Sequence, residues 1–184
     1  MVNYSNKIEG FEFSETERLA IKELSPLIRE HSEEIVDRVL SIAAKNSEVL
    51  NILQKNNVSA ECAKKAWIKG VNFIFSDNTT EEISEEMKKI GTIHVEKEVK
   101  EDLVVLAITL FIDETENVLS KYTEINTEKL KAIIKMYNFV LLLMISAYRK
   151  ELEEREQAVL NFMGISPELL KRQILLGKKS LKKE

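Results

Sequence analysis

The sequence is poor in the residues that punctuate a chain and in those that build metal or disulfide sites. Its 184 residues include five Gly and two Pro, too few turn-formers for a sandwich or barrel of many short strands. The single Cys62 excludes an internal disulfide, and two histidines leave little room for zinc or a histidine-based triad. No basic and then apolar leader opens the chain. We therefore expect an all-α protein of the reducing cytoplasm.

The composition is that of a soluble globular domain, with 44% hydrophobic and 32% charged residues. A chain of this length should bury roughly 70% of its unfolded surface around one core. The net charge of −4 argues against a surface devoted to nucleic acid. Because the sequence offers no convincing nucleophile or acid–base pair, we do not expect an enzyme.

Capping residues and apolar periodicity divide the chain into helices. Ser14 and Glu17 have the spacing of a capping box, and so do Thr79 and Glu82. Pro26 is favourable in the first turn of a helix, so we expect one helix to end near residue 24 and another to begin there. In all, helices are expected over residues 14–24, 27–44, 49–53, 58–75, 79–94, 103–119 and 127–162.

We expect these helices to form a single domain without internal repeats. An arm over residues 1–13 should precede the domain at 14–163. A short helix capped by Ser166 and Pro167, followed by a basic tail, should occupy residues 164–184. The tail is interpreted either as a solvated terminus or as an element that reports a change to a partner.

The run over residues 127–162 indicates association with a second copy. At 1.5 Å per residue this helix would be about 54 Å long, which exceeds the width of a domain of this size. Its segment 139–147 is apolar on every side, yet it is far shorter than the ~20 residues that span a membrane. Such a segment is either a central core helix or a helix buried on two sides. We expect a homodimer through it and no membrane association.

His94 is the residue best placed for chemistry. It follows Ile83, Met87 and Ile90 at helical spacing, so it lies in an apolar stripe rather than on the charged face. A buried imidazole must hydrogen-bond or ligate something, because an unpartnered polar group costs about 1–3 kcal/mol. Two interpretations stay open: a core histidine bonded to a backbone carbonyl, or a ligand. His31 lies among charged residues, and we expect it to be exposed and without a role.

A row of small residues lies along the helix at 58–75. Ala63, Ala66 and Gly70 share one face, with Trp67 beside them. Such a row permits either close helix packing or a flat apolar ligand with Trp67 as one wall. A porphyrin would use this groove together with an axial imidazole and cations near its propionates. The lysines near enough in sequence, most of which are equally explained as solvated surface residues, are Lys64, Lys65, Lys88, Lys89 and Lys97.

Three segments carry a family resemblance. They are residues 23–37 (ELSPLIREHSEEIVD), Phe75 followed by an acidic Thr-capped helix that ends KIGTIH at His94, and the pairs Tyr137-Asn138 and Ala147-Tyr148. The first is similar to the early helices of the sensor globins, the family of globin-coupled sensors and protoglobins. The second resembles the proximal helix of that family, and the third resembles its dimerising helix.

The resemblance, which reaches to about Glu156, implies a globin-like all-α fold with a long C-terminal dimerising helix and a haem cofactor. It implies that His94 ligates the iron and that a diatomic gas (O2, CO or NO) binds on the opposite face. The residues expected to surround the haem are Leu40, Ala63, Ala66, Trp67, Gly70, Ile90, Ile93, Leu103 and Tyr137.

The sequence departs from the family at three places. Leu40 fills the position of a distal tyrosine, and Ala66 fills a second polar position. A charged stretch over residues 96–104 replaces the Gly-Leu-Pro segment and aromatic pair that commonly follow the ligand histidine. Because the pocket lacks these hydrogen-bond donors, we expect it to favour CO or NO over O2 relative to family members that have the tyrosine. Trp67 is the one nearby side chain that could donate instead.

The chain ends without a cyclase, kinase or receptor module, so we expect a sensor that signals through a partner protein. The alternative is a haem-free module that keeps the globin fold and acts as a dimeric interaction domain in a stress-signalling complex. The missing donors and the diverged loop favour the alternative, whereas the small-residue groove and His94 favour haem. The lysine-rich tail lacks the interleaved aromatics of a nucleic-acid site.

Overall fold

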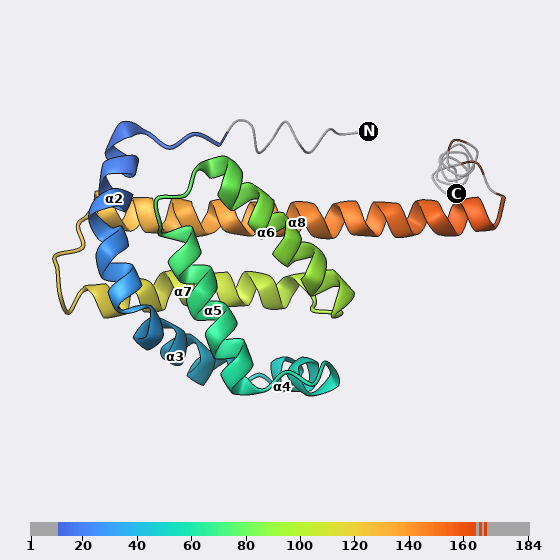
Figure 1. Cartoon of the computed structure of the whole chain (residues 1–184), viewed down its shortest axis with the longest axis horizontal. Helices are drawn as coiled ribbons and strands as arrows, with labels where there is room; N and C mark the ends of the chain where they lie inside the picture. Colours follow the sequence, from blue (N-terminus) through green and yellow to red (C-terminus); the bar gives the residue numbers. More distant parts are fainter. Residues whose placement is uncertain (1–10, 165, 167, 169–184) are drawn as a thin grey trace, which may run out of the picture. The chain divides into compact units, whose positions relative to one another are not determined.

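The computed structural model describes residues 11–164, 166 and 168, and over this range it contains seven helices and no strand, as the sequence predicts. The helices are α2 (Glu15–Glu30), α3 (Ser32–Ala43), α4 (Ser47–Lys55), α5 (Ala60–Ile74), α6 (Thr80–Glu96), α7 (Glu101–Leu119) and α8 (Thr127–Phe162) (Figure 1). Most of the expected arm, and nearly all of the short last helix and basic tail, lie outside the described residues.

The chain divides into two compact units, residues 1–147 and 148–184. The core and the cavity described below belong to the first unit. The described part of the second unit is the end of α8, a largely exposed helix that carries ion pairs one turn apart, Lys150 with Glu154 and Arg155 with Glu151.

Capping boxes start α2 and α6 where the sequence predicts them. The Ser14 hydroxyl accepts from the Glu17 amide, and the Glu17 carboxylate accepts from the Ser14 amide at 2.7 Å. Thr79 and Glu82 repeat the arrangement. Lys135 of α8 donates to Glu17 at 2.6 Å, and this contact is the main reason that the Glu17 pKa lies below its ordinary value. The same cap therefore also ties α2 to α8.

The expected helix boundary at Pro26 is wrong. Helix α2 continues through Pro26, and the chain breaks instead at His31. Pro26 and Lys22, whose carbonyl loses its amide partner, are both exposed, so water can take over that hydrogen bond and the helix persists. His31 is half-buried rather than exposed, and its ring stacks on Tyr122 at 3.9 Å between centroids.

Side chains from α3, α5, α7 and α8 meet in the core of the first unit. In Figure 1, α7 and the beginning of α8 run in opposite directions, and α5 and α6 cross them. Tyr137 connects α8 to α7: its hydroxyl forms a hydrogen bond with that of Thr115 at 2.9 Å, and its ring stacks on Phe111. Phe75, at the end of α5, packs edge-on against the same ring.

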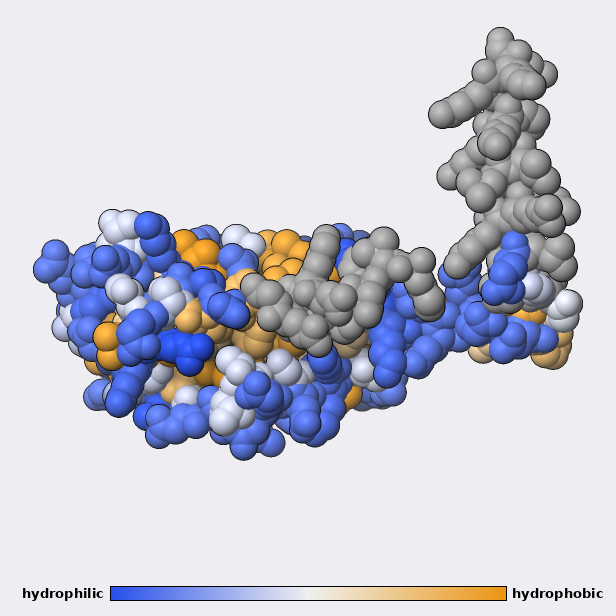
Figure 2. All heavy atoms as spheres, turned by 90° about the horizontal axis from the view of Figure 1, so that it is seen from above, coloured by the Kyte–Doolittle hydropathy of each residue, from blue (hydrophilic) through white to orange (hydrophobic). Residues whose placement is uncertain are grey.

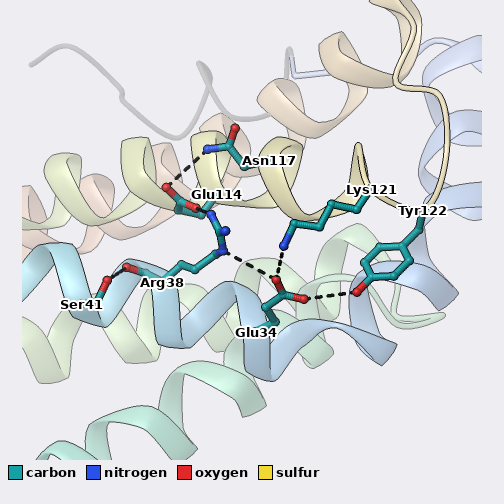
Figure 3. A network of polar contacts seen from close by, with 7 residues as sticks. All are labelled: Glu34, Arg38, Ser41, Glu114, Asn117, Lys121 and Tyr122. Atoms are coloured by element: carbon teal, nitrogen blue, oxygen red, sulfur yellow. Dashed lines mark hydrogen bonds and ion pairs between the residues drawn. The ribbon is translucent and has the colours of Figure 1, made fainter.

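A polar junction connects α3 to α7 (Figure 3). The Arg38 guanidinium donates to Glu114 at 2.9 Å and lies 3.6 Å from Glu34. Glu114 is buried, so its charge needs this partner. Lys121 and Tyr122 donate to Glu34 from beyond the end of α7, and the Lys121 contact is the main cause that lowers the Glu34 pKa. The junction fixes α3 along α7.

Helix α8 is, among the described residues, the one helix long and apolar enough to cross a membrane by length and composition. Half of its most apolar window is buried inside the protein, which is the behaviour of a core helix. Figure 2 shows hydrophobic residues in patches between hydrophilic ones on the visible face. On α8 itself the side chain of Leu142 is 44% exposed.

Gly91 lets α6 approach α8 closely. A Cβ atom built on Gly91 would lie 2.8 Å from the Ala147 Cβ and 2.8 Å from the carbonyl oxygen of Met144. The oxygen belongs to helix backbone, which cannot move aside easily. Any side chain at this position would therefore push the two helices apart.

We predict that Gly91→Ala lowers the free energy of unfolding by about 1–3 kcal/mol, because the added methyl group overpacks the contact with α8. Gly70→Ala is the matched control, since nothing lies within 4 Å of a Cβ there and alanine favours a helix by about 0.5–1 kcal/mol. Urea unfolding of both variants measures the difference. Equal stability of the two variants would show that the α6–α8 contact is not tight.

Candidate functional site

A cavity of about 400 Å³ lies inside the first unit, a size within the roughly 300–1,000 Å³ typical of sites for small molecules and cofactors. Residues from α3 to α8 line it, and almost all of them are apolar. The lining residues with polar side-chain atoms are His94, Trp67 and Tyr137. The cavity is therefore suited to an apolar ligand that is anchored at very few points.

His94 belongs to the last turn of α6 and is half-buried at the cavity wall. Its Nδ1 lies 2.7 Å from the carbonyl oxygen of Ile90, one turn earlier in the same helix. Because a carbonyl oxygen only accepts, this contact assigns the ring proton to Nδ1 and leaves the lone pair on Nε2. Burial lowers the pKa of His94, so the ring is neutral at pH 7.

The backbone around His94 is held on both sides. The amide of Val99 donates to the His94 carbonyl oxygen at 2.9 Å, which folds the following loop back onto the helix end. Gly91, one turn before His94, holds α6 against α8. The ring direction thus depends on main-chain contacts, which suits a residue that must present one nitrogen in a fixed position.

The structure brings most of the expected pocket residues together. His94, Ala66, Trp67, Gly70, Ile90, Ile93, Leu103 and Tyr137 all line the one cavity. Among the described residues, Leu40 and Ala63 are not part of the lining: Leu40 is half-buried in α3 and Ala63 is buried in α5. Ala43, nearly one turn after Leu40, is the residue by which α3 reaches the cavity.

Sequence reasoning missed the share of α4 and α7 in the cavity wall. Val49, Ile52 and Leu53 of α4 line it, although none of them is fully buried. From α7, in addition to Leu103, the lining includes Val104, Leu106, Ala107, Ile108, Leu110 and Phe111. Val49, Ile52 and Leu53 have helical spacing and form an apolar face. This spacing was the one feature of the sequence that could have indicated the contribution of α4.

Aromatic rings reinforce the cavity wall. Trp67 of α5 packs edge-on against Phe111 of α7, with 5.4 Å between the centroids, and Phe111 stacks on Tyr137. The Tyr137 hydroxyl is engaged by Thr115, and burial raises the Tyr137 pKa above its ordinary value. Tyr137 is therefore a neutral, fixed wall rather than a proton donor that is free to turn.

The lysines considered near the groove are largely engaged elsewhere. Lys64 binds Glu33 and Asp37 of α3, and these contacts raise the Lys64 pKa. Lys65 and Lys89 form ion pairs within their own helices. No basic side chain other than the imidazole appears in the cavity lining over the described part of the chain. Over the same part, no group of three or more His, Cys, Asp or Glu side chains is arranged to hold a metal ion.

Comparisons with known proteins agree with this architecture. The protoglobin family model matches residues 3–154. The globin domain of the Geobacter sulfurreducens globin-coupled sensor matches the structure with a TM-score of 0.68 at 18% sequence identity, over 78% of this chain and 97% of that domain. A search of curated protein sequences gave no match. The structural match shows a shared globin fold, and the family match over most of the chain shows that this protein belongs to the protoglobin family.

Proposed function

We propose that the chain binds haem, with His94 as the axial ligand, and senses a diatomic gas. The observation that carries the proposal is a neutral imidazole, tethered through Nδ1 alone, at the wall of an apolar cavity of about 400 Å³. Membership of the protoglobin family supports the same cofactor. When bound, haem supplies an iron atom that takes O2, CO or NO as a ligand.

The residues of this chain hold and orient the cofactor. His94 offers Nε2, and the hydrogen bond from its Nδ1 to Ile90 fixes the ring and increases the basicity of Nε2. Ala66 and Gly70 leave room along α5, and Trp67 forms a rigid wall between α5 and α7. The apolar lining favours small uncharged ligands over charged ones. The proposal is a binding function, not catalysis.

The cavity favours this function over the haem-free alternative. An apolar pocket of this size leaves nonpolar side chains without close packing unless a ligand fills it, and that lowers stability. An interaction module that works through its outer surface gains nothing from a cavity of this size. The lost distal donors, which support the alternative, are equally explained by a sensor whose ligand needs no hydrogen bond.

We further propose a cytoplasmic homodimer that passes its signal to a partner protein. The support is an apolar face on α8 within the first unit, where Leu142 is 44% exposed and Leu141 and Ile145 are half-buried. Val105 of α7 is also exposed, at 43%. Apolar faces of this kind are covered in self-associating helical proteins.

Removing a group that only hydrogen-bonds to a metal ligand already weakens binding by about 10- to 100-fold. We predict that His94→Ala, which removes the ligand itself, weakens haem binding by more than that. Visible absorption during haem titration measures the affinity, and added imidazole should restore the wild-type spectrum in the variant. His31→Ala is the control and should bind as the wild type does. A wild-type protein that stays colourless with excess haem contradicts the proposal.

We predict fast O2 release from the reduced protein, because Ala66 lines the cavity at a position where the family resemblance implies a polar group in some members. Ala66→Gln would add an amide donor worth about 1–2 kcal/mol, which slows release about 5- to 30-fold. Ala66→Leu, similar in bulk but without a donor, controls for volume. Stopped-flow displacement of O2 by CO gives the rates. Release from the wild type as slow as from Ala66→Gln would show that a donor is already present.

We predict that Leu142→Glu converts the dimer to a monomer, because it places a charge in an apolar interface. Leu19→Glu, which also replaces an exposed leucine but lies in α2, should leave the dimer intact. Sedimentation velocity over a range of concentrations distinguishes the two states. A monomeric wild-type protein at high concentration rules out the α8 interface.

A further inference from the structure

A second, polar pocket of about 200 Å³ adjoins the apolar cavity. It is lined by Glu48, Asn51, Ile52, Lys55, Glu98 and Lys100. Ile52 lines both the polar pocket and the cavity. The polar pocket thus lies where α4 meets the loop between α6 and α7, the same loop whose Val99 lines the cavity and bonds to the His94 carbonyl.

Two ion pairs cross the polar pocket, each between α4 and the loop or its end. Lys55 lies 2.5 Å from Glu98, and Lys100 lies 2.7 Å from Glu48. All four side chains are 47–68% exposed. Exposed ion pairs contribute little to stability, so either lysine can exchange its carboxylate partner at small cost.

The frame of the polar pocket does not depend on these ion pairs. The Asn56 side-chain amide donates to the Lys97 carbonyl oxygen at 3.0 Å and also to the Ile52 carbonyl oxygen at 3.0 Å. These bonds hold the end of α4 against the loop through neutral groups. The two lysines can therefore turn to a new partner without release of α4.

The position of these lysines sets them apart from the other cations near the groove. Lys55 and Lys100 line the polar pocket, which shares Ile52 with the cavity. Lys64, by contrast, is held by two carboxylates of α3.

Resting on the proposed haem function, we propose that Lys55 and Lys100 receive the two propionate carboxylates of haem at this rim, in exchange for Glu98 and Glu48. The porphyrin ring then occupies the apolar cavity, and its acidic edge reaches the polar pocket. Glu48 and Glu98 act as internal competitors that keep the lysines paired in the absence of the cofactor. No covalent bond forms or breaks in this exchange.

The test compares haem with haem dimethyl ester, which has the same ring and iron but no free carboxylates. Binding to the full-length protein is followed by quenching of Trp67, the single tryptophan of the chain. Lys55→Met with Lys100→Met should weaken haem binding about 5- to 30-fold and change ester binding less than about twofold. Glu48→Gln with Glu98→Gln should instead tighten haem binding by about 3- to 10-fold, again without effect on the ester.

Lys65→Met with Lys89→Met is the matched control, because both lysines are exposed and paired within their own helices. Thermal melting of each protein verifies folding, and the Glu48 and Glu98 variant, whose expected change is a gain, cannot be explained by loss of fold. Equal responses of haem and ester to the rim variants overturn this inference while haem binding stands. Failure of the wild type to bind either compound overturns the haem function itself, and the rim assignment with it.

Discussion

The 2.7 Å hydrogen bond between His94 Nδ1 and the Ile90 carbonyl oxygen decides what the imidazole can do. It fixes the tautomer, and it orients the ring relative to the axis of α6. The same bond in a filled interior would make His94 a satisfied core residue. The two interpretations that the sequence leaves open therefore share this bond and differ in the space beside the ring. That space is bounded by residues of five other helices. The spacing of residues along α6 alone therefore cannot distinguish the two interpretations.

Capping residues and apolar periodicity in the sequence were sufficient to predict most of the helices. The hydroxyl and carboxylate of Thr79 and Glu82 start α6, and an uninterrupted period gives α8 its bounds at residues 127–162. Pro26 led to a wrong prediction of the boundary between α2 and α3, because α2 continues through it. A helix can continue through a proline when the carbonyl group left without a partner faces water. That condition depends on which face of the helix is buried, and local rules do not contain it.

The candidate site was predicted best where it lies on the helices that carry a recognisable stripe. Ala66, Trp67 and Gly70 line the cavity as expected, whereas Ala63, expected on the same face of α5, is buried outside the lining. The wall from α4 and the α7 residues other than Leu103 were missed for a different reason: a 3.6-residue period shows that a face is apolar but not which space it borders. Leu40 was expected from family resemblance, and the geometry gives the α3 position to Ala43.

The glycine one turn before His94 gives this architecture a mechanical property. At Gly91 the backbone of α6 lies against the Met144 backbone and the Ala147 methyl group of α8, and none of these groups has a rotamer that could absorb a small displacement. A shift of α6 at this point would therefore be passed to the Met144 carbonyl as a movement of backbone against backbone.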